Sequence, residues 1–257
     1  MMGILELKGL GKNFGKNVAV NAIDLSIKKG QIRGLIGPNG SGKTTIFNLI
    51  SGFIQPSRGR VYFQGEDITD LPPHIVAKKG IARTFQLAAL YKEITVLENV
   101  IMACHLHVRA TLWEQFWRNK RTRREESEIE DKALDLLEVM GILEIKNEIA
   151  GDLPHGHQAA LGIANVLATE PKLIMLDEPV SGMNPIETAQ TMERIQKVRD
   201  RGITVFLVEH DMKAVTTTCD EITCINFGNK LTEGIPDDVC RHPEVIEAYL
   251  GGEINTC

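Results

Sequence analysis

Residues 37–44 read Gly-Pro-Asn-Gly-Ser-Gly-Lys-Thr, which is a complete phosphate-binding loop of the Walker A pattern. The apolar run Ile32–Ile36 before the loop predicts a buried strand, and Thr45–Ile50 after it predicts the first turns of a helix. The glycines let the backbone turn tightly enough to direct several N–H groups at one anion, and the helix N-terminus adds partial positive charge. This strand–loop–helix context predicts a site for a nucleoside triphosphate.

The side chains of the loop have separate expected roles. Lys43 is predicted to reach the outer phosphates, and the Thr44 hydroxyl to ligate Mg²⁺. A glycine-rich turn that fits the pattern by chance is the alternative, and the flanking strand and helix argue against it. The candidate phosphate-binding residues are Asn39, Gly40, Ser41, Gly42, Lys43, Thr44 and Thr45.

Composition limits the remaining classes of protein. The chain has 257 residues, 43% hydrophobic and 25% charged, which suits a globular domain with a large core. The net charge of -5 argues against a nucleic-acid partner, because nucleic-acid-binding modules are usually basic. The 5 cysteines lack paired metal spacing, which argues against a structural zinc site and favours reduced thiols in the cytosol. No run approaches the roughly 18 apolar residues of a spanning helix, so we expect a chain that is soluble by itself. If it acts at a membrane, another chain must supply the membrane part.

The order of elements along the chain predicts an α/β core with an insertion. Short apolar runs at Leu173–Leu176 and Ile203–Val208 suit parallel strands covered on both faces, and Pro185–Arg201 between them predicts a helix. From residue 95 to residue 169 the apolar spacing is helical, which predicts a helical subdomain inserted between residues 1–94 and 170–257. Other expected strands, with turns around Gly11, Gly15 and Gly30, are Ile4–Leu7, Ala19–Ile27, Arg60–Gln64, Glu221–Phe227 and Lys230–Gly234.

The insertion contains a basic run, Arg118–Arg124. Such a run can contact anionic lipid headgroups, but a solvated helix start is the more frequent use of this pattern.

The strand Leu173–Leu176 leads directly into two acidic residues, Asp177 and Glu178. In a phosphate-loop protein, an aspartate at the carboxyl end of a strand can hold Mg²⁺ through water, as in the Walker B motif. A neighbouring carboxylate can orient and polarise the attacking water. We therefore expect metal binding at Asp177 and catalysis at Glu178.

With these motifs in place, the chain resembles an ABC transporter ATP-binding subunit from about Leu5 to Leu250. Thr84-Phe85-Gln86 is similar to the family's glutamine loop, and Ser181–Asn184 stands at the position of its D-loop. Glu209-His210-Asp211 stands at the histidine switch, and Phe14 where the family stacks an aromatic ring on adenine. The segment at the position of the family signature consists of Leu153, Pro154, His155, Gly156, His157 and Gln158.

The resemblance implies the fold and the role of each site residue. The fold is the ABC ATPase fold, an α/β phosphate-loop core with a small antiparallel β subdomain and an inserted helical subdomain. Phe14 and Val20 would hold adenine, while Thr44 and Gln86, with Asp177 through water, would hold Mg²⁺. Glu178 would be the general base and His210 would sense the γ-phosphate of ATP. Two such subunits would sandwich two ATP molecules, each between the phosphate loop of one chain and the signature of the other.

Within the family, the chain resembles the branched-chain amino-acid uptake type. The cues are Thr95–Val100, the enlarged helical insertion, Gly182–Pro185 and the ending Glu247–Gly251. This resemblance implies a second ATP-binding subunit of the same or a different kind, integral membrane permease subunits and an external solute-binding protein. It places the chain at the cytoplasmic face of the cell membrane. Amides, urea or lipids are the alternative transported solutes.

The signature departs from the family pattern. Pro154 stands at the position of the usual serine and His155 at that of the next glycine. Proline has neither a hydroxyl nor an N–H to offer a phosphate. We therefore expect a weaker contribution to the ATP held by the partner, and two unequal ATP sites in a heterodimer. The alternative is that a shifted backbone, or His155 or His157, replaces the serine contact and the two sites are equal. Asn165 replaces a common arginine and Asn184 the usual D-loop aspartate.

Two other classes of protein remain as alternatives. A soluble ABC ATPase for DNA repair or the ribosome would carry a long coiled-coil insertion or a second cassette, and the sequence has neither. An unrelated phosphate-loop enzyme such as a kinase would not need Gln86, residues 153–158 and His210 together.

Overall fold

The computed structural model describes residues 3–84, 90–107 and 120–250. The chain divides into two compact units. One unit comprises Met1–Arg83, Lys172–Pro179 and Val198–Cys257, and the other comprises Thr84–Pro171 and Val180–Lys197. The predicted boundaries at residues 94/95 and 169/170 stay a prediction.

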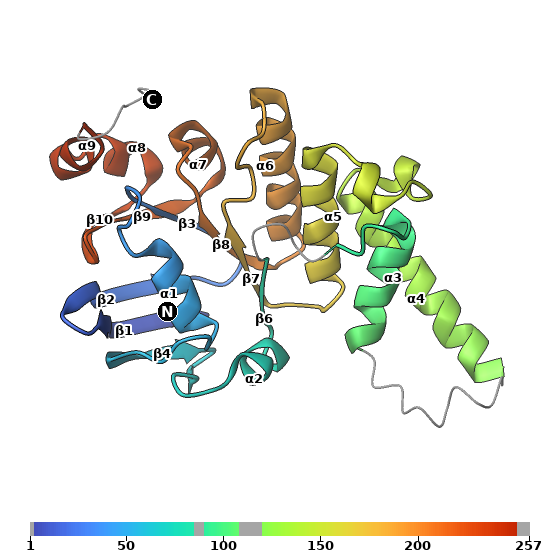
Figure 1. The fold of residues 1–257 in the computed structure, drawn as a ribbon, viewed down its shortest axis with the longest axis horizontal. Coiled ribbons are helices and arrows are strands. Elements are labelled where there is room, and N and C mark those ends of the chain that lie inside the picture. The colour runs from blue at the N-terminus through green and yellow to red at the C-terminus, as the bar shows by residue number, and fades with distance from the viewer. Residues whose placement is uncertain (1–2, 85–89, 108–119, 251–257) are drawn as a thin grey trace. The chain divides into compact units, whose positions relative to one another are not determined.

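A six-stranded, mostly parallel sheet forms the centre of the first unit, in the order β10-β9-β3-β8-β7-β6 (Figure 1). Every residue of β3 and β8 is buried, which explains why these strands are continuous apolar runs rather than alternating ones. Only the β9–β10 pair is antiparallel among the described strands of this sheet. The strands are β3 (Ile32–Ile36), β6 (Ile81–Arg83), β7 (Leu173–Asp177), β8 (Thr204–Val208), β9 (Glu221–Asn226) and β10 (Asn229–Gly234).

A second, antiparallel sheet has the order β2-β1-β4-β5. Its strands are β1 (Leu5–Phe14), β2 (Asn17–Ile27), β4 (Arg58–Phe63) and β5 (Glu66–Asp67). The predicted end of the first strand at Leu7 and the turn around Gly11 were wrong, because β1 continues through both Gly9 and Gly11. Register shifts interrupt its pairing with β2 between Leu7 and Asn13, so β-bulges absorb the residues that were interpreted as a turn.

Helix α1 (Lys43–Ile50) shares one hydrophobic core with both sheets. Its Phe47 ring lies 5.0 Å from the ring of Phe206 in β8, and both side chains are fully buried. The core also includes Leu7 of β1 and Val61 of β4. The phosphate loop is therefore anchored at its helical end by packing against both sheets.

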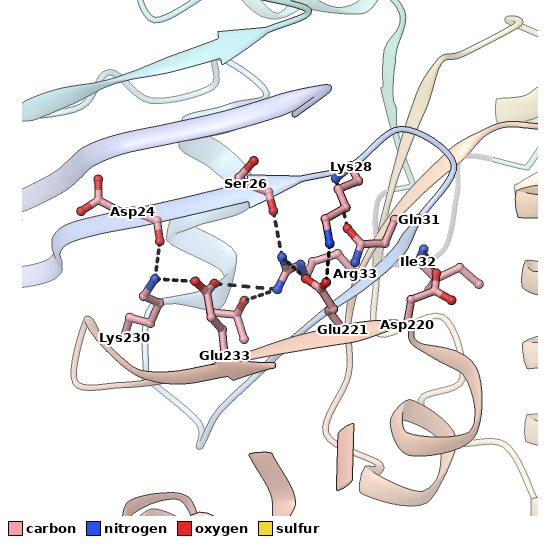
Figure 2. Close-up of polar contacts among 11 residues, drawn as sticks. Asp24, Ser26, Lys28, Gln31, Ile32, Arg33, Asp220, Glu221, Lys230 and Glu233 are labelled. Atoms are coloured by element: carbon pink, nitrogen blue, oxygen red, sulfur yellow. Dashed lines mark hydrogen bonds and ion pairs between the residues drawn. The ribbon is translucent and has the colours of Figure 1, made fainter. Parts of the chain in front are cut away.

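A buried arginine, Arg33, connects β2 to the six-stranded sheet (Figure 2). Its Nη2 donates to the Ser26 carbonyl oxygen at 2.8 Å and lies 2.6 Å from a Glu221 carboxylate oxygen. The Lys28 ammonium donates to the same carboxylate at 2.7 Å and holds the pKa of Glu221 below its ordinary value. Because a buried charge requires partners, this cluster ties β2, β3 and β9 together.

The remaining elements of the first unit are short helices. They are α2 (Pro73–Lys78), α7 (Met212–Thr218), α8 (Pro236–Cys240) and α9 (Pro243–Leu250). Asp211 caps α7, since its side chain accepts a hydrogen bond from the Ala214 N–H at 3.0 Å.

The second unit is helical in its described part. It contains α3 (Val96–His107), α4 (Lys120–Val139), α5 (His155–Leu167) and most of α6 (Pro185–Asp200), with 3₁₀ turns η2 (Leu143–Ile145) and η3 (Ala150–Asp152). Thr95 and Glu98 form a capping box, with each backbone N–H donating to the other's side chain at 2.8 and 3.2 Å, which fixes the start of α3. The predicted helical character of this stretch agrees with these elements.

Over the described ranges, no helix combines the length and the apolar character that crossing a membrane requires.

Candidate functional site: a nucleotide pocket

The phosphate loop connects the end of β3 at Ile36 to the start of α1 at Lys43, as the sequence predicts. Gly37 and Gly42 have φ angles of 154° and 109°. A Cβ atom at Gly37 would lie 2.2 Å from the Ile225 carbonyl oxygen, and one at Gly42 would lie 2.6 Å from that of Ala19. These two glycines are required because neighbouring backbone approaches the loop too closely for any side chain.

Lys43 lies against the loop that precedes it. Its Nζ donates to the carbonyl oxygens of Gly37 at 2.6 Å and Pro38 at 2.9 Å. Burial lowers the pKa of the Lys43 ammonium, while the nearby Glu178 and Asp177 carboxylates oppose that shift. The ammonium is thus held at the loop with two acidic groups close enough to affect its protonation.

The acidic pair lies at the carboxyl end of β7, and β8 lies between β7 and β3 in the sheet. Because these strands are parallel, the carboxyl ends of β3, β7 and β8 share one edge, where ligands of open α/β sheets bind. Glu178 has a left-handed backbone with φ of 50°, and its N–H donates to the Val208 carbonyl oxygen at 2.9 Å. This strained residue directs the chain away from the sheet directly after Asp177.

Asp177 has a partner that the sequence did not indicate. Arg83, at the end of β6, donates from Nη2 to the Asp177 carboxylate at 2.8 Å, and the two side chains are only 8% and 9% exposed. The same guanidinium donates to the Asn48 side-chain oxygen at 2.6 Å. Arg83 thereby links the end of β7 to the helix that follows the phosphate loop.

A pocket of about 370 Å³ lies over the phosphate loop. Glu178 is in its wall together with the loop residues, whereas Val20 is fully buried and Phe14 is half exposed outside the lining. Four lining residues that lie far from the loop along the chain were not predicted from the sequence: Asn17, Val18, Ala19 and Phe227. The lining consists of Asn17, Val18, Ala19, Asn39, Gly40, Ser41, Gly42, Lys43, Thr44, Thr45, Glu178 and Phe227.

Of the two other residues expected at this site, His210 has a described position. His210 follows β8 by two residues, and its side chain is 57% exposed with Nδ1 3.8 Å from the buried Glu209 carboxylate. It therefore lies at the same sheet edge as the acidic pair. Gln86 lies outside the described residues, and its expected role stays a prediction.

The segment 153–158 belongs to the second unit. Pro154 is the N-cap of α5 and makes no side-chain capping bond, and its carbonyl oxygen accepts from the N–H groups of His157 and Gln158 at 3.0 Å. The Gln158 amide donates to the Leu153 carbonyl oxygen at 2.9 Å. A helix N-terminus therefore follows Pro154 directly.

The donors beside the loop suit Mg²⁺. Asp177 offers a carboxylate and Thr44 an exposed hydroxyl, both hard oxygen ligands. Within the described ranges, no cluster of three or more His, Cys, Asp or Glu side chains forms a protein-only metal cage. That combination fits an ion bound by one or two protein oxygens together with substrate phosphates.

Most of the pocket residues lie within a region that is similar to a known protein family. Residues 20–181, which include the loop and the acidic pair, match the family described as ABC transporter. The chain belongs to the ABC transporter family. Residues 229–254 also match a family described as branched-chain amino acid ATP-binding cassette transporter.

The similarity to individual ABC proteins covers nearly the whole chain. The chain is 43% identical over 249 residues to BraF, a high-affinity branched-chain amino acid transport ATP-binding protein of Pseudomonas aeruginosa, covering 96% of this chain and 98% of BraF. Its structure is similar to the ADP conformation of an ATP-binding cassette of an ABC transporter, with a TM-score of 0.86 and 33% identity over 98% of this chain and 100% of that one.

A third similar protein is a dimeric ATP-binding cassette in a post-hydrolysis state with ADP and phosphate. Its TM-score is 0.74 at 26% identity, over 90% of this chain and 98% of that one.

These findings confirm the predicted family and the ABC ATPase fold. As an ABC cassette, the chain binds and hydrolyses ATP, and this ATPase activity is coupled to transport. The alternative that the chain is an unrelated phosphate-loop enzyme, such as a kinase, was therefore wrong.

Proposed function

We propose that this cassette powers the import of branched-chain amino acids. The observation that carries the proposal is the 43% identity to BraF over 96% of the chain, with the phosphate loop and acidic pair complete in the same chain. The additional family match at residues 229–254 supports the same solute class. Since a cassette does not itself bind the solute, amides, urea and lipids are outcomes of the test below.

The pocket supports one role for each group around it. The N–H groups of the phosphate loop and the Lys43 ammonium bind the phosphates, since both carry positive charge into the pocket. Glu178, in the pocket wall, accepts the proton of the attacking water as general base. His210, at the same sheet edge, contacts the γ-phosphate, and Gln86 approaches the metal.

Thr44 and Gln86, with Asp177 through water, would hold Mg²⁺. When bound, the ion would neutralise charge on the phosphates, which assists attack of water on the γ-phosphorus and departure of ADP. Arg83 fixes the orientation of the Asp177 carboxylate, because its Nη2 donates to one of the two carboxylate oxygens.

Two cassettes form an ATP sandwich, in which the segment Leu153–Gln158 of this chain faces the ATP on its partner's loop. The dimeric cassette with ADP and phosphate supports this arrangement, as it is similar over 90% of this chain. ATP binds the closed dimer more tightly than the open one, and this difference in affinity closes it.

Integral permease subunits and an external solute-binding protein complete the transporter, and the cassette lies at the cytoplasmic face of the membrane. Nucleic acid is not a partner, consistent with the net charge of -5.

The test is to purify the chain with its permease subunits, reconstitute them in liposomes and measure phosphate release. Adding the solute-binding protein loaded with leucine is expected to raise the rate of hydrolysis and drive leucine uptake. The matched control is the Lys43→Ala variant of the same complex, which should do neither. Stimulation by an amide, urea or a lipid but not by leucine would contradict the solute class. Full activity of a dilute monomer would contradict the sandwich.

A further inference from the structure

The hairpin between β9 and β10 has an unusual residue at its tip. The strands end at Asn226 and resume at Asn229, so Phe227 and Gly228 form a two-residue turn. Their φ angles are 45° and 76°. Positive φ at both central residues is the requirement of a type I′ turn, which favours Asn-Gly. Phenylalanine in this conformation is strained, and such strain is found where a side chain is needed for function.

The Phe227 side chain is 81% exposed and is in the wall of the nucleotide pocket. Val18, 45% exposed, is in the same lining. The other pocket residues are mostly polar groups of the phosphate loop. The pocket thus offers apolar surface beside a polar cradle, which matches the two chemically different ends of a nucleotide: a flat base and a chain of phosphates.

Backbone hydrogen bonds hold this turn against the phosphate loop. The Gly228 N–H donates to the Ser41 carbonyl oxygen at 2.9 Å, and the Gly228 carbonyl oxygen accepts from the Asn21 N–H at 2.8 Å. The Asn229 amide donates to the Phe227 carbonyl oxygen at 3.1 Å. A Cβ atom at position 228 would lie 2.8 Å from the Ala19 carbonyl oxygen, so only glycine fits there. The position of Phe227 relative to the loop is therefore fixed by the backbone.

We propose that Phe227 binds the base of the nucleotide, as an aromatic platform additional to the one expected at Phe14. The ligand class is a nucleoside triphosphate whose base stacks on the exposed ring, while the loop holds the phosphates. Aromatic stacking on a base is sequence-tolerant and strong, because every base offers a π-face. The proposal rests on ATP binding in this pocket.

The experiment compares ATP with inorganic tripolyphosphate by calorimetry on the full chain, in wild type and Phe227→Asn. Asparagine removes the ring but suits the turn, so the variant should fold and unfold at a higher temperature than wild type. ATP affinity is expected to fall about tenfold, in line with stacking losses on alanine substitution. Tripolyphosphate affinity should stay within about twofold, because it has no base. Phe227→Tyr keeps the ring and should retain ATP affinity.

Gln64→Asn is the matched control. Gln64 has φ of 51° and precedes Gly65 (82°) between β4 and β5, outside the pocket lining. It should leave the affinity for both ligands unchanged. Unchanged ATP affinity in Phe227→Asn would overturn the proposal. If dimerisation weakened at the same time, the ring would contact the second cassette rather than the base. Equal loss of both ligands would also overturn it, since the turn would then only support the loop. Failure of wild type to bind ATP would instead contradict the nucleotide site itself.

Discussion

Arg83→Met removes the cation that faces Asp177 and replaces it with an apolar side chain of similar length. In the native chain the guanidinium lies 2.8 Å from the Asp177 carboxylate, donates to the Asn48 oxygen at 2.6 Å and lies 5.4 Å from the centre of the Phe47 ring. The ion pair is almost fully buried, with 8% and 9% of the two side chains exposed. Solvent can therefore replace the lost partner only in small part.

The magnitude follows from that burial. Removing one partner of a buried pair lowers the free energy of unfolding by about 3–5 kcal/mol, because the other charge is left unpaired. The unpaired Asn48 oxygen adds to this loss, whereas a methionine sulfur on the Phe47 ring offsets roughly 0.3–1.5 kcal/mol. We expect a net loss of about 3 kcal/mol. With a urea m-value of about 3 kcal/mol/M, the unfolding midpoint falls by about 1 M.

The assay is urea unfolding of the full chain followed by far-ultraviolet circular dichroism. Arg60→Met is the matched control, because its pair with Asp67 is on the surface, with 59% and 34% of the side chains exposed. It should leave the midpoint close to that of wild type. The double variant Arg83→Met/Asp177→Asn should recover part of the loss, with a coupling energy of about 1–3 kcal/mol. A midpoint for Arg83→Met equal to that of Arg60→Met would refute the reasoning, as would additive losses in the double variant.

Four further outcomes are expected. Glu178→Gln should keep ATP affinity and lower phosphate release about a hundredfold or more, because the amide cannot accept the proton; near-normal turnover in the assembled complex would exclude Glu178 as the base. Lys43→Ala should weaken ATP binding by about 1.5–3 kcal/mol in calorimetry, and unchanged affinity would contradict the phosphate contact. Pro154→Ser should add a side-chain N-cap to α5 and stabilise the chain by about 1 kcal/mol in thermal unfolding. The same variant should raise the rate of hydrolysis only for the ATP on the partner's phosphate loop. An equal rise at both ATP sites would argue against unequal sites. Burial raises the pKa of the Cys219 and Cys224 thiols to about 12, so at pH 8 iodoacetamide should modify them only after unfolding, as peptide mass spectrometry would show. Rapid modification of the folded chain would mean that these thiols are accessible.

The motif-bearing elements were predictable because their chemistry is local. A phosphate loop needs a strand before it, a helix after it and glycines between them, and Ile32–Ile50 meets all three requirements within one short stretch. Asp177 and Glu178, the acidic pair at the end of β7, were predicted for a similar reason, since an apolar run that ends in carboxylates indicates the end of a buried strand. The first strand was misjudged at Gly11, because a β-bulge is defined by the neighbouring strand and not by the bulged residue alone.

The folded chain decided which distant residues share the pocket. Phe227 and Val18 join the phosphate loop through the pairing of β9 with β3 and the position of β2, and Arg83 meets Asp177 because β6 pairs with β7. Nothing in the spacing of these residues along the chain indicates those neighbours. The physical reason is that apolar periodicity reports how deeply a residue is buried, whereas strand order depends on which backbone edges pair across long stretches of chain.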